Sequence, residues 1–189
     1  MALSIIAGLK RGLKLESPPP ATARPTAAMV REALFSMIAG RIPGARTLDL
    51  YAGSGAMGLE AASRGAASVL LCDRDPEVLR TLRRNASRFG EGFAVSVAEL
   101  SFPEGFPALG RHAPFDLMLL DPPYAEREAP LEFLREAPGL GLAAPGALLV
   151  WEMAPATLKA LPSLDTGSFS VTKTRAWGAR AAAILEYEG

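Results

Sequence analysis

One short stretch, Gly53-x-Gly55-x-x-Gly58, most restricts how this chain of 189 residues can fold. It follows a strand-like run at residues 46–51 and precedes a predicted helix at residues 59–64. Glycines at this spacing permit a tight turn and let the backbone approach a ligand at the N-terminus of the following helix. The stretch therefore predicts one strand–loop–helix unit of a nucleotide-binding α/β domain.

The alternation of strands and helices continues along the chain. A βαβ order of this kind calls for a doubly wound, Rossmann-like sheet that is mostly parallel, with right-handed crossovers. Two late runs should pair as an antiparallel addition at the C-terminus. The predicted strands are residues 46–51, 68–72, 94–98, 115–120, 147–151, 168–174 and 181–187, and the predicted helices are 26–38, 59–64, 76–89 and 129–137.

The N-terminal segment is expected to be a short β-hairpin extension. Two β-type runs surround a glycine-containing turn, and a Pro18-Pro19-Pro20 linker follows. A hairpin of this size is too small to be stable alone, so it should pack on the main domain or serve a partner. We therefore divide the chain into an extension and linker at residues 1–23 and a main domain at residues 24–189.

Composition restricts the cellular setting and the chemistry. A single cysteine, Cys72, excludes an internal disulfide and favours the cytoplasm; its apolar surroundings predict a small buried side chain. One histidine and one cysteine provide no metal-binding cluster. The net charge is zero, but the residues before Asp49 carry seven basic and two acidic side chains, and a second basic group lies on a predicted helix at Arg80, Arg83, Arg84 and Arg88. Each basic group is compatible with either RNA binding or a solvated face.

Three acidic residues stand at the ends of successive predicted strands: Asp49, Asp73 and Glu99. In such a sheet, these ends line the crevice where ligands bind. A carboxylate at Asp73 can accept both ribose hydroxyls, which suits NAD and S-adenosylmethionine equally. Asp49 favours the second cofactor, because a carboxylate there would repel a pyrophosphate and attract a cationic amino acid and sulfonium. Glu99 is placed to meet an adenine amino group.

A fourth strand end carries Asp121-Pro122-Pro123-Tyr124. A double proline stops the strand and leaves an acidic acceptor and an aromatic ring at its carboxyl end. Such a strand end could hold a planar amine, because the acceptors would take hydrogen bonds from its N–H groups and the ring would stack on its plane. A plain strand end with a half-buried tyrosine is the alternative explanation.

These motifs together resemble the RsmD family of 16S rRNA guanine-N2 methyltransferases, which use S-adenosylmethionine. Tyr51-Ala52-Gly53-Ser54-Gly55 and Asp-Pro-Pro-Tyr are shared more widely by methyltransferases of exocyclic base amines. The more specific matches are Ile5-Ile6-x-Gly8, Gly12-x-Lys14-Leu15, Arg24-Pro25-Thr26, Val30-Arg31-Glu32-Ala33-Leu34-Phe35, Gly58-Leu59-Glu60-Ala61, Ser63-Arg64-Gly65-Ala66 and Leu82-Arg83-Arg84-Asn85. The resemblance covers roughly residues 3–187.

The resemblance implies a role for each matched position. Asp121, Pro122 and Tyr124 would hold the guanine, and the hairpin residues Lys10, Arg11 and Lys14 would guide 16S rRNA within a small subunit or assembly intermediate. The chain would act as a monomer. S-adenosylmethionine would be held by Arg24, Thr26, Asp49, Tyr51, Ala52, Gly53, Ser54, Gly55, Asp73, Arg74, Glu99 and Leu100.

The chain departs from the family pattern mainly in the hairpin, where Ser4 and Leu13 replace arginines and Ala7 replaces a glycine. These changes remove positive charge from the segment expected to guide RNA. Other functions remain open at this stage. An adenine-N6 methyltransferase would use the same glycine loop and Asp-Pro-Pro-Tyr motif, and a dehydrogenase would use the glycine loop. A non-catalytic assembly module would bind S-adenosylmethionine or RNA without transferring a methyl group.

Overall fold

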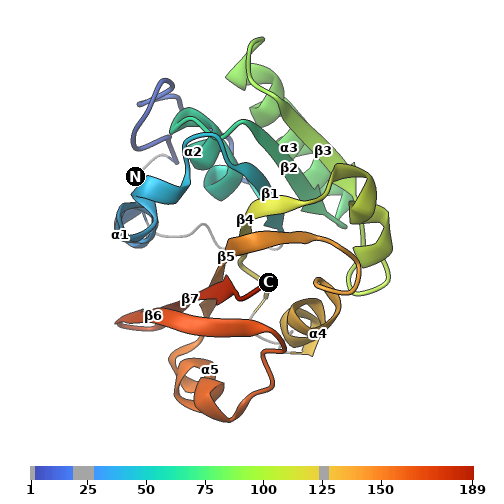
Figure 1. Ribbon diagram of the computed structural model, residues 1–189. Coiled ribbons are helices and arrows are strands. Elements are labelled where there is room, and N and C mark those ends of the chain that lie inside the picture. The colour runs from blue at the N-terminus through green and yellow to red at the C-terminus, as the bar shows by residue number, and fades with distance from the viewer. Residues whose placement is uncertain (1–2, 19–27, 124–127) are drawn as a thin grey trace. The chain divides into compact units, whose positions relative to one another are not determined.

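The computed structural model describes residues 3–18, 28–123 and 128–189. The chain forms two compact units, Met1–Leu100 and Ser101–Gly189, and each is described in turn (Figure 1).

The first unit is built on three parallel strands in the order β3-β2-β1. Leu50 pairs with Cys72, and Asp73 pairs with Glu99, so the carboxyl ends of neighbouring strands lie side by side. The strands are β1 (Arg46–Leu50), β2 (Ser68–Asp73) and β3 (Val95–Glu99), and the helices are α1 (Ala28–Met37), η1 (Ala39–Arg41), α2 (Ala56–Ser63) and α3 (Pro76–Phe89).

Local sequence signals account for the ends of these helices. Asp75 caps α3, because its Oδ1 accepts the backbone N–H groups of Glu77 (2.8 Å) and Val78 (3.2 Å), and Pro76 occupies the first helical position. Helix α2 begins three residues earlier than predicted, since Gly55 adopts a left-handed conformation and serves as its N-cap. The first two residues of the helix predicted at 26–38 lie outside the described residues.

The predicted N-terminal hairpin is present as a short antiparallel pair. Ser4 bridges Lys14, Ile5 N–H donates to the Leu13 carbonyl (3.0 Å), and Leu15 N–H donates to the Leu3 carbonyl (2.9 Å). Ile5 and Leu15 are buried in the same core as the apolar sides of α2 and α3. The hairpin therefore packs on the first unit, which provides the apolar surface that so small an element needs.

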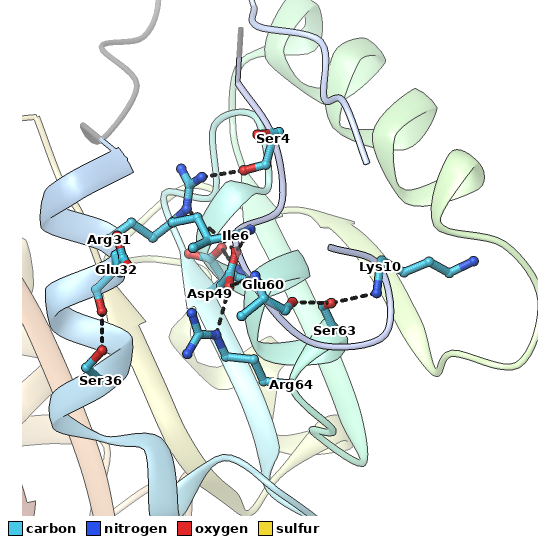
Figure 2. Close-up of polar contacts among 12 residues, drawn as sticks. Ser4, Ile6, Lys10, Arg31, Glu32, Ser36, Asp49, Glu60, Ser63 and Arg64 are labelled. Carbon is cyan, nitrogen blue, oxygen red and sulfur yellow. Dashed lines mark hydrogen bonds and ion pairs between the residues drawn. The ribbon is translucent and has the colours of Figure 1, made fainter. Parts of the chain in front are cut away.

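A buried carboxylate fixes the hairpin to α2. Glu60, fully buried, accepts the backbone N–H groups of Ile6 (2.7 Å) and Ala7 (3.0 Å) and the Nε–H of Arg64 (2.7 Å) (Figure 2). Arg31, 1% exposed, places its Nε 3.8 Å from the same carboxylate and donates from Nη2 to the Ser4 carbonyl. The three hydrogen bonds to Glu60 compensate for the burial of its charge, which would otherwise be costly.

Ser63 supplies a second contact between the hairpin and α2. Its hydroxyl donates to the Ala7 carbonyl (2.6 Å) and accepts Lys10 N–H (2.9 Å), while its carbonyl accepts Leu9 N–H (2.8 Å). The turn of the hairpin is thus held by both polar groups of one helical residue.

The second unit carries four further strands, with helices between them. Strands β4 and β5 are parallel, β7 is antiparallel to β5, and β6 pairs antiparallel with β7 as a long hairpin (Figure 1). The strands are β4 (Phe115–Leu120), β5 (Ala143–Met153), β6 (Phe169–Trp177) and β7 (Arg180–Tyr187), and the helices are η2 (Phe106–His112), α4 (Glu128–Glu136), α5 (Pro155–Ala160) and η3 (Leu161–Ser163).

The expected α/β class, with parallel strands and an antiparallel addition at the C-terminus, is confirmed. Strand β5 is longer than predicted at both ends, and α5 lies where we had predicted no element. Among the described residues, no helix has the length and apolar character required to cross a membrane.

The hairpin turn provides a test of this packing. Gly8 has φ +83°, and a Cβ there would lie 1.9 Å from the Ser63 carbonyl oxygen, whereas Gly12 has φ +84° and open space around it. Gly8→Ala should lower the free energy of unfolding by about 3 kcal/mol, because the side chain would displace the turn from α2. Gly12→Ala should cost only the left-handed backbone penalty of about 1 kcal/mol. Denaturant unfolding of both variants measures this difference, and equal losses would contradict the proposed packing of the turn.

Candidate active site

The loop between β1 and α2 adopts an unusual backbone conformation. Tyr51 has φ 63°, Gly53 has φ 56° and Gly55 has φ 80°. Only glycine enters this left-handed region without a steric cost, so the two glycines are required by the turn. Tyr51 is not a glycine, and strained residues of this kind persist where the surrounding structure holds them, often at functional sites.

The third glycine of the loop is required by close packing. Gly58 N–H donates to Asp49 Oδ2 (2.8 Å), and a Cβ on Gly58 would lie 2.3 Å from Leu71 Cδ2 and 2.9 Å from Val69 Cγ1. Asp49 is only 2% exposed. Its carboxylate therefore fixes the first turn of α2 against β1, a structural role that we had not predicted for this residue.

Asp73 holds the other side of the loop. Its Oδ2 accepts Gly53 N–H (3.0 Å), and its Oδ1 accepts the N–H groups of Arg74 (2.8 Å) and Asp75 (3.1 Å). Two backbone bonds lie beside it, from Ala52 N–H to the Cys72 carbonyl and from Leu100 N–H to the Asp73 carbonyl. The structure thus brings together the predicted residues Ala52, Gly53, Asp73, Arg74 and Leu100 at one edge of the three strands.

Glu99 ends β3 directly beside Asp73. Its side chain is 61% exposed and lies 3.7 Å from Arg83 of α3. Arg74 is exposed, and Ser54 is buried, with its carbonyl accepting the Nδ2–H of Asn85 (2.8 Å). The three predicted carboxylates therefore differ in setting: Asp49 is buried, Asp73 is half-buried and Glu99 is open to solvent.

The predicted amine-binding motif lies at the end of β4, in the second unit. Asp121 follows the last strand residue, Leu120, and is half-buried, while Pro122 is buried and Pro123 is exposed. Tyr124, Arg24 and Thr26 lie outside the described residues. The strand end and its abrupt stop at the prolines are as expected, and the role of Asp121, Pro122 and Tyr124 remains a prediction.

The predicted RNA-guiding cations have different surroundings. Arg11 and Lys14 are exposed, while the ammonium of Lys10 lies over the ring of Phe93, 5.3 Å from its centroid. Each arginine of the second basic group, on α3, forms an ion pair with an acidic neighbour. The pairs are Arg80–Glu77 (3.0 Å), Arg83–Glu99 (3.7 Å), Arg84–Glu16 (2.7 Å) and Arg88–Glu16 (2.6 Å). The hairpin is thus the more open of the two basic surfaces.

The sequence reasoning missed the roles of three buried polar residues: Arg31, Glu60 and Asn85. Each is part of a segment that resembles the family, yet the segments by themselves indicated no contact. A signal was available in the pattern, because each residue lies among apolar neighbours on the inward side of its helix. A charged or amide side chain at such a position must find partners when the helix packs.

Comparison with known proteins identifies the family. The model of the family described as conserved hypothetical protein 95 matches residues 3–185. The chain belongs to this family. Curated relatives place it among RsmD proteins: Ribosomal RNA small subunit methyltransferase D of Escherichia coli (strain K12) is 39% identical over 124 residues, 65% of this chain and 60% of the relative. YlbH of Bacillus subtilis (strain 168), named as a candidate rRNA methyltransferase, is 34% identical over 127 residues, 67% of this chain and 69% of the relative.

Solved structures agree with this assignment. The protein yhhF of Escherichia coli, described as a candidate methyltransferase, matches with a TM-score of 0.82 and 30% identity over 100% of this chain and 99% of that one. The hypothetical protein TTHA0928 of Thermus thermophilus matches with a TM-score of 0.77 and 32% identity over 97% of this chain and 98% of that one. The predicted membership of the RsmD family is confirmed, and so is the predicted cofactor, S-adenosylmethionine.

The close packing of Gly58 yields a prediction. Gly58→Ala should lower the free energy of unfolding by about 2–3 kcal/mol, since the new methyl group must displace Leu71 or the Asp49 carboxylate. Gly110→Ala is the matched control: a Cβ there has no neighbour within 4 Å, so the change should stay within about 0.5 kcal/mol. Thermal and denaturant unfolding measure both, and a neutral Gly58→Ala would contradict the packing described.

The buried thiol yields a second prediction. Cys72 is fully buried, as expected, and burial raises the pKa of its thiol well above the usual range, with Asp49 and Asp73 adding to the rise. The thiolate is the reactive form, so the native protein should resist iodoacetamide at pH 8 and react once unfolded. Mass spectrometry measures the extent of modification. Rapid alkylation of the folded protein would show that this end of β2 is accessible.

Proposed function

We propose that this protein transfers a methyl group from S-adenosylmethionine to the exocyclic N2 amine of a guanine in small-subunit rRNA. The observation that carries the proposal is the match to the RsmD family over residues 3–185, with the glycine loop and Asp-Pro-Pro-Tyr retained. The substrate is 16S rRNA, within a small subunit or an assembly intermediate, and the enzyme acts as a cytoplasmic monomer.

The residues of the first unit suit the proposed cofactor. A Cβ on Gly53 would have only the Tyr51 carbonyl oxygen near it, at 3.9 Å, so the backbone there can be approached by a ligand, and the loop lies at the N-terminus of α2. Asp73 would accept the ribose hydroxyls, and Glu99, exposed at the neighbouring strand end, would accept from the adenine amine. Asp49 provides negative charge behind the loop, where a cationic methionine group would be favoured.

The end of β4 suits the proposed acceptor. S-adenosylmethionine, when bound, supplies an electrophilic methyl group. The guanine amine is a poor nucleophile because its lone pair is delocalised into the ring. Hydrogen bonds from its two N–H groups to the Asp121 carboxylate and the Pro122 carbonyl would localise that lone pair. Tyr124 would stack on the base, a contact worth on the order of 1–3 kcal/mol.

No tuned general base is required in this mechanism. The amine becomes strongly acidic once methylated, so its proton can leave to water. The task of the protein is to hold the amine at near-attack distance from the methyl group, and positioning of that kind supplies much of the rate of such reactions.

Substitutions should separate the two halves of the site. Asp121→Ala should abolish methyl transfer and leave S-adenosylmethionine binding within a few-fold, because it removes an amine acceptor only. Asp73→Ala should weaken cofactor binding first, about tenfold or more, since it removes both a ribose acceptor and the bond to Gly53 N–H. Calorimetric titration and a methyl-transfer assay measure the two effects. Equal loss of both functions in Asp121→Ala would contradict the division of roles.

The target base needs its own experiment. Labelled S-adenosylmethionine should be incubated with unmodified small-subunit rRNA, with assembled small subunits and with DNA, and the labelled base should then be mapped. We expect label on a guanine N2 of the RNA. Label on an adenine N6 would support the rival activity, and binding without any transfer would support a non-catalytic assembly role.

A further inference from the structure

One fully buried amide joins the N-terminal hairpin to the glycine loop within the first unit. Asn85 lies on α3 and is 0% exposed. Its Nδ2 donates to two carbonyls, that of Ser54 in the loop (2.8 Å) and that of Glu16 after the hairpin (2.9 Å). Its Oδ1 accepts Glu16 N–H (2.8 Å). Both donors and the acceptor are thus used, and two segments far apart in sequence share one side chain.

The contact with Glu16 is unusually specific. Asn85 pairs with both backbone groups of that residue, as a neighbouring strand would. The side chain of Glu16 adds surface ion pairs to Arg84 and Arg88, and the hydrogen bond from Arg84 lowers its pKa. These pairs are partly exposed, so they contribute little compared with the buried amide contacts.

The other end of the hairpin is held independently. Glu60 and Ser63 of α2 fix residues 6–10, as Figure 2 shows, while Asn85 of α3 fixes residue 16. Of these three anchors, Asn85 also bonds the loop between Gly53 and Gly55. When the hairpin is docked, its two bonds at Glu16 fix the orientation of the Asn85 amide, and the amide then points its remaining N–H at the Ser54 carbonyl.

We propose that Asn85 is a positioning residue for the cofactor, through which docking of the N-terminal hairpin preorganises the glycine loop. The hairpin is then part of the support of the cofactor site as well as an RNA guide. Because coupling between sites is reciprocal, cofactor binding must tighten the hairpin to the same degree. This inference rests on the proposed cofactor site at the loop.

Two substitutions at Glu16 isolate the backbone contact. Glu16→Ala removes both surface ion pairs and keeps the N–H that donates to Asn85. Glu16→Pro removes the ion pairs and also that N–H, and the preceding Leu15 is already in an extended pair that tolerates a following proline. Both variants keep the carbonyl at position 16 that accepts from Asn85 Nδ2, so the difference between them reports the loss of the N–H bond to Asn85 Oδ1.

We expect S-adenosylmethionine to bind Glu16→Ala within about twofold of the natural chain and Glu16→Pro about five- to tenfold more weakly, because the buried amide loses a partner. Asn85→Asp should weaken binding about tenfold or more, since a carboxylate oxygen would face two carbonyls. In each weakened variant, KM for the cofactor should rise with kcat nearly unchanged at saturation. Equal affinity in Glu16→Pro and Glu16→Ala would overturn the proposal.

Hydrogen exchange provides a readout that needs no activity. Without cofactor, the Gly55 amide, which donates to the Ala52 carbonyl, should exchange faster in Glu16→Pro and Asn85→Asp than in Glu16→Ala. Adding S-adenosylmethionine to the natural chain should slow exchange at residues 13–16. Lower melting temperatures with unchanged loop exchange and affinity would assign Asn85 a merely structural role.

The Asp73→Ala variant distinguishes failure of the coupling from failure of the proposed site. If Asp73→Ala loses cofactor binding while the Glu16 and Asn85 variants keep it, the cofactor site stands and the coupling is wrong. If Asp73→Ala binds S-adenosylmethionine like the natural chain, the assignment of the cofactor to this loop is wrong, and with it the coupling.

Discussion

The left-handed turn between β1 and α2 is the constraint on which the first unit depends. Three residues of the turn have positive φ, and two carboxylates hold it: Asp49 bonds Gly58 N–H and Asp73 bonds Gly53 N–H. Asp49 is the penultimate residue of β1 and Asp73 is the last residue of β2, so the pairing of β1 with β2 sets the distance between the two anchors. The turn is therefore built by the sheet, and it leaves Gly53 partly accessible, where a ligand can approach.

Buried polar side chains also fix the position of the N-terminal hairpin in this unit. Glu60 and Asn85 are fully buried, and each forms two hydrogen bonds with the backbone of the N-terminal segment. Buried polar contacts of this kind specify one arrangement, since a displaced hairpin would leave several groups unpaired. The small hairpin thus gains a defined position that its own few backbone bonds could not provide.

Prediction succeeded where a feature is encoded by neighbouring residues. The helix predicted at residues 76–89 is α3 with the same bounds, the strand predicted at residues 115–120 is β4, and the glycine spacing predicted the loop. Prediction was less successful for the ends of elements, which depend on packing. Helix α2 begins three residues before the predicted start because of the conformation of Gly55, and β5 extends along its neighbouring strands beyond the predicted apolar run. Arg31, Glu60 and Asn85 were not assigned roles, because their partners in the N-terminal segment lie 27 to 69 residues away.

The sequence alone therefore determined the α/β class, the glycine loop and the order of acidic strand ends, since these depend on local spacing and composition, and its longer motifs carried the resemblance to the family. Only the tertiary structure decided that Asp49 is buried and bonded to Gly58, that the arginines of α3 pair with acidic side chains, and that Asn85 joins the hairpin to the loop. The physical reason is the same in each case. A hydrogen bond or ion pair requires two groups within about 3–4 Å, and spacing along the chain does not set that distance.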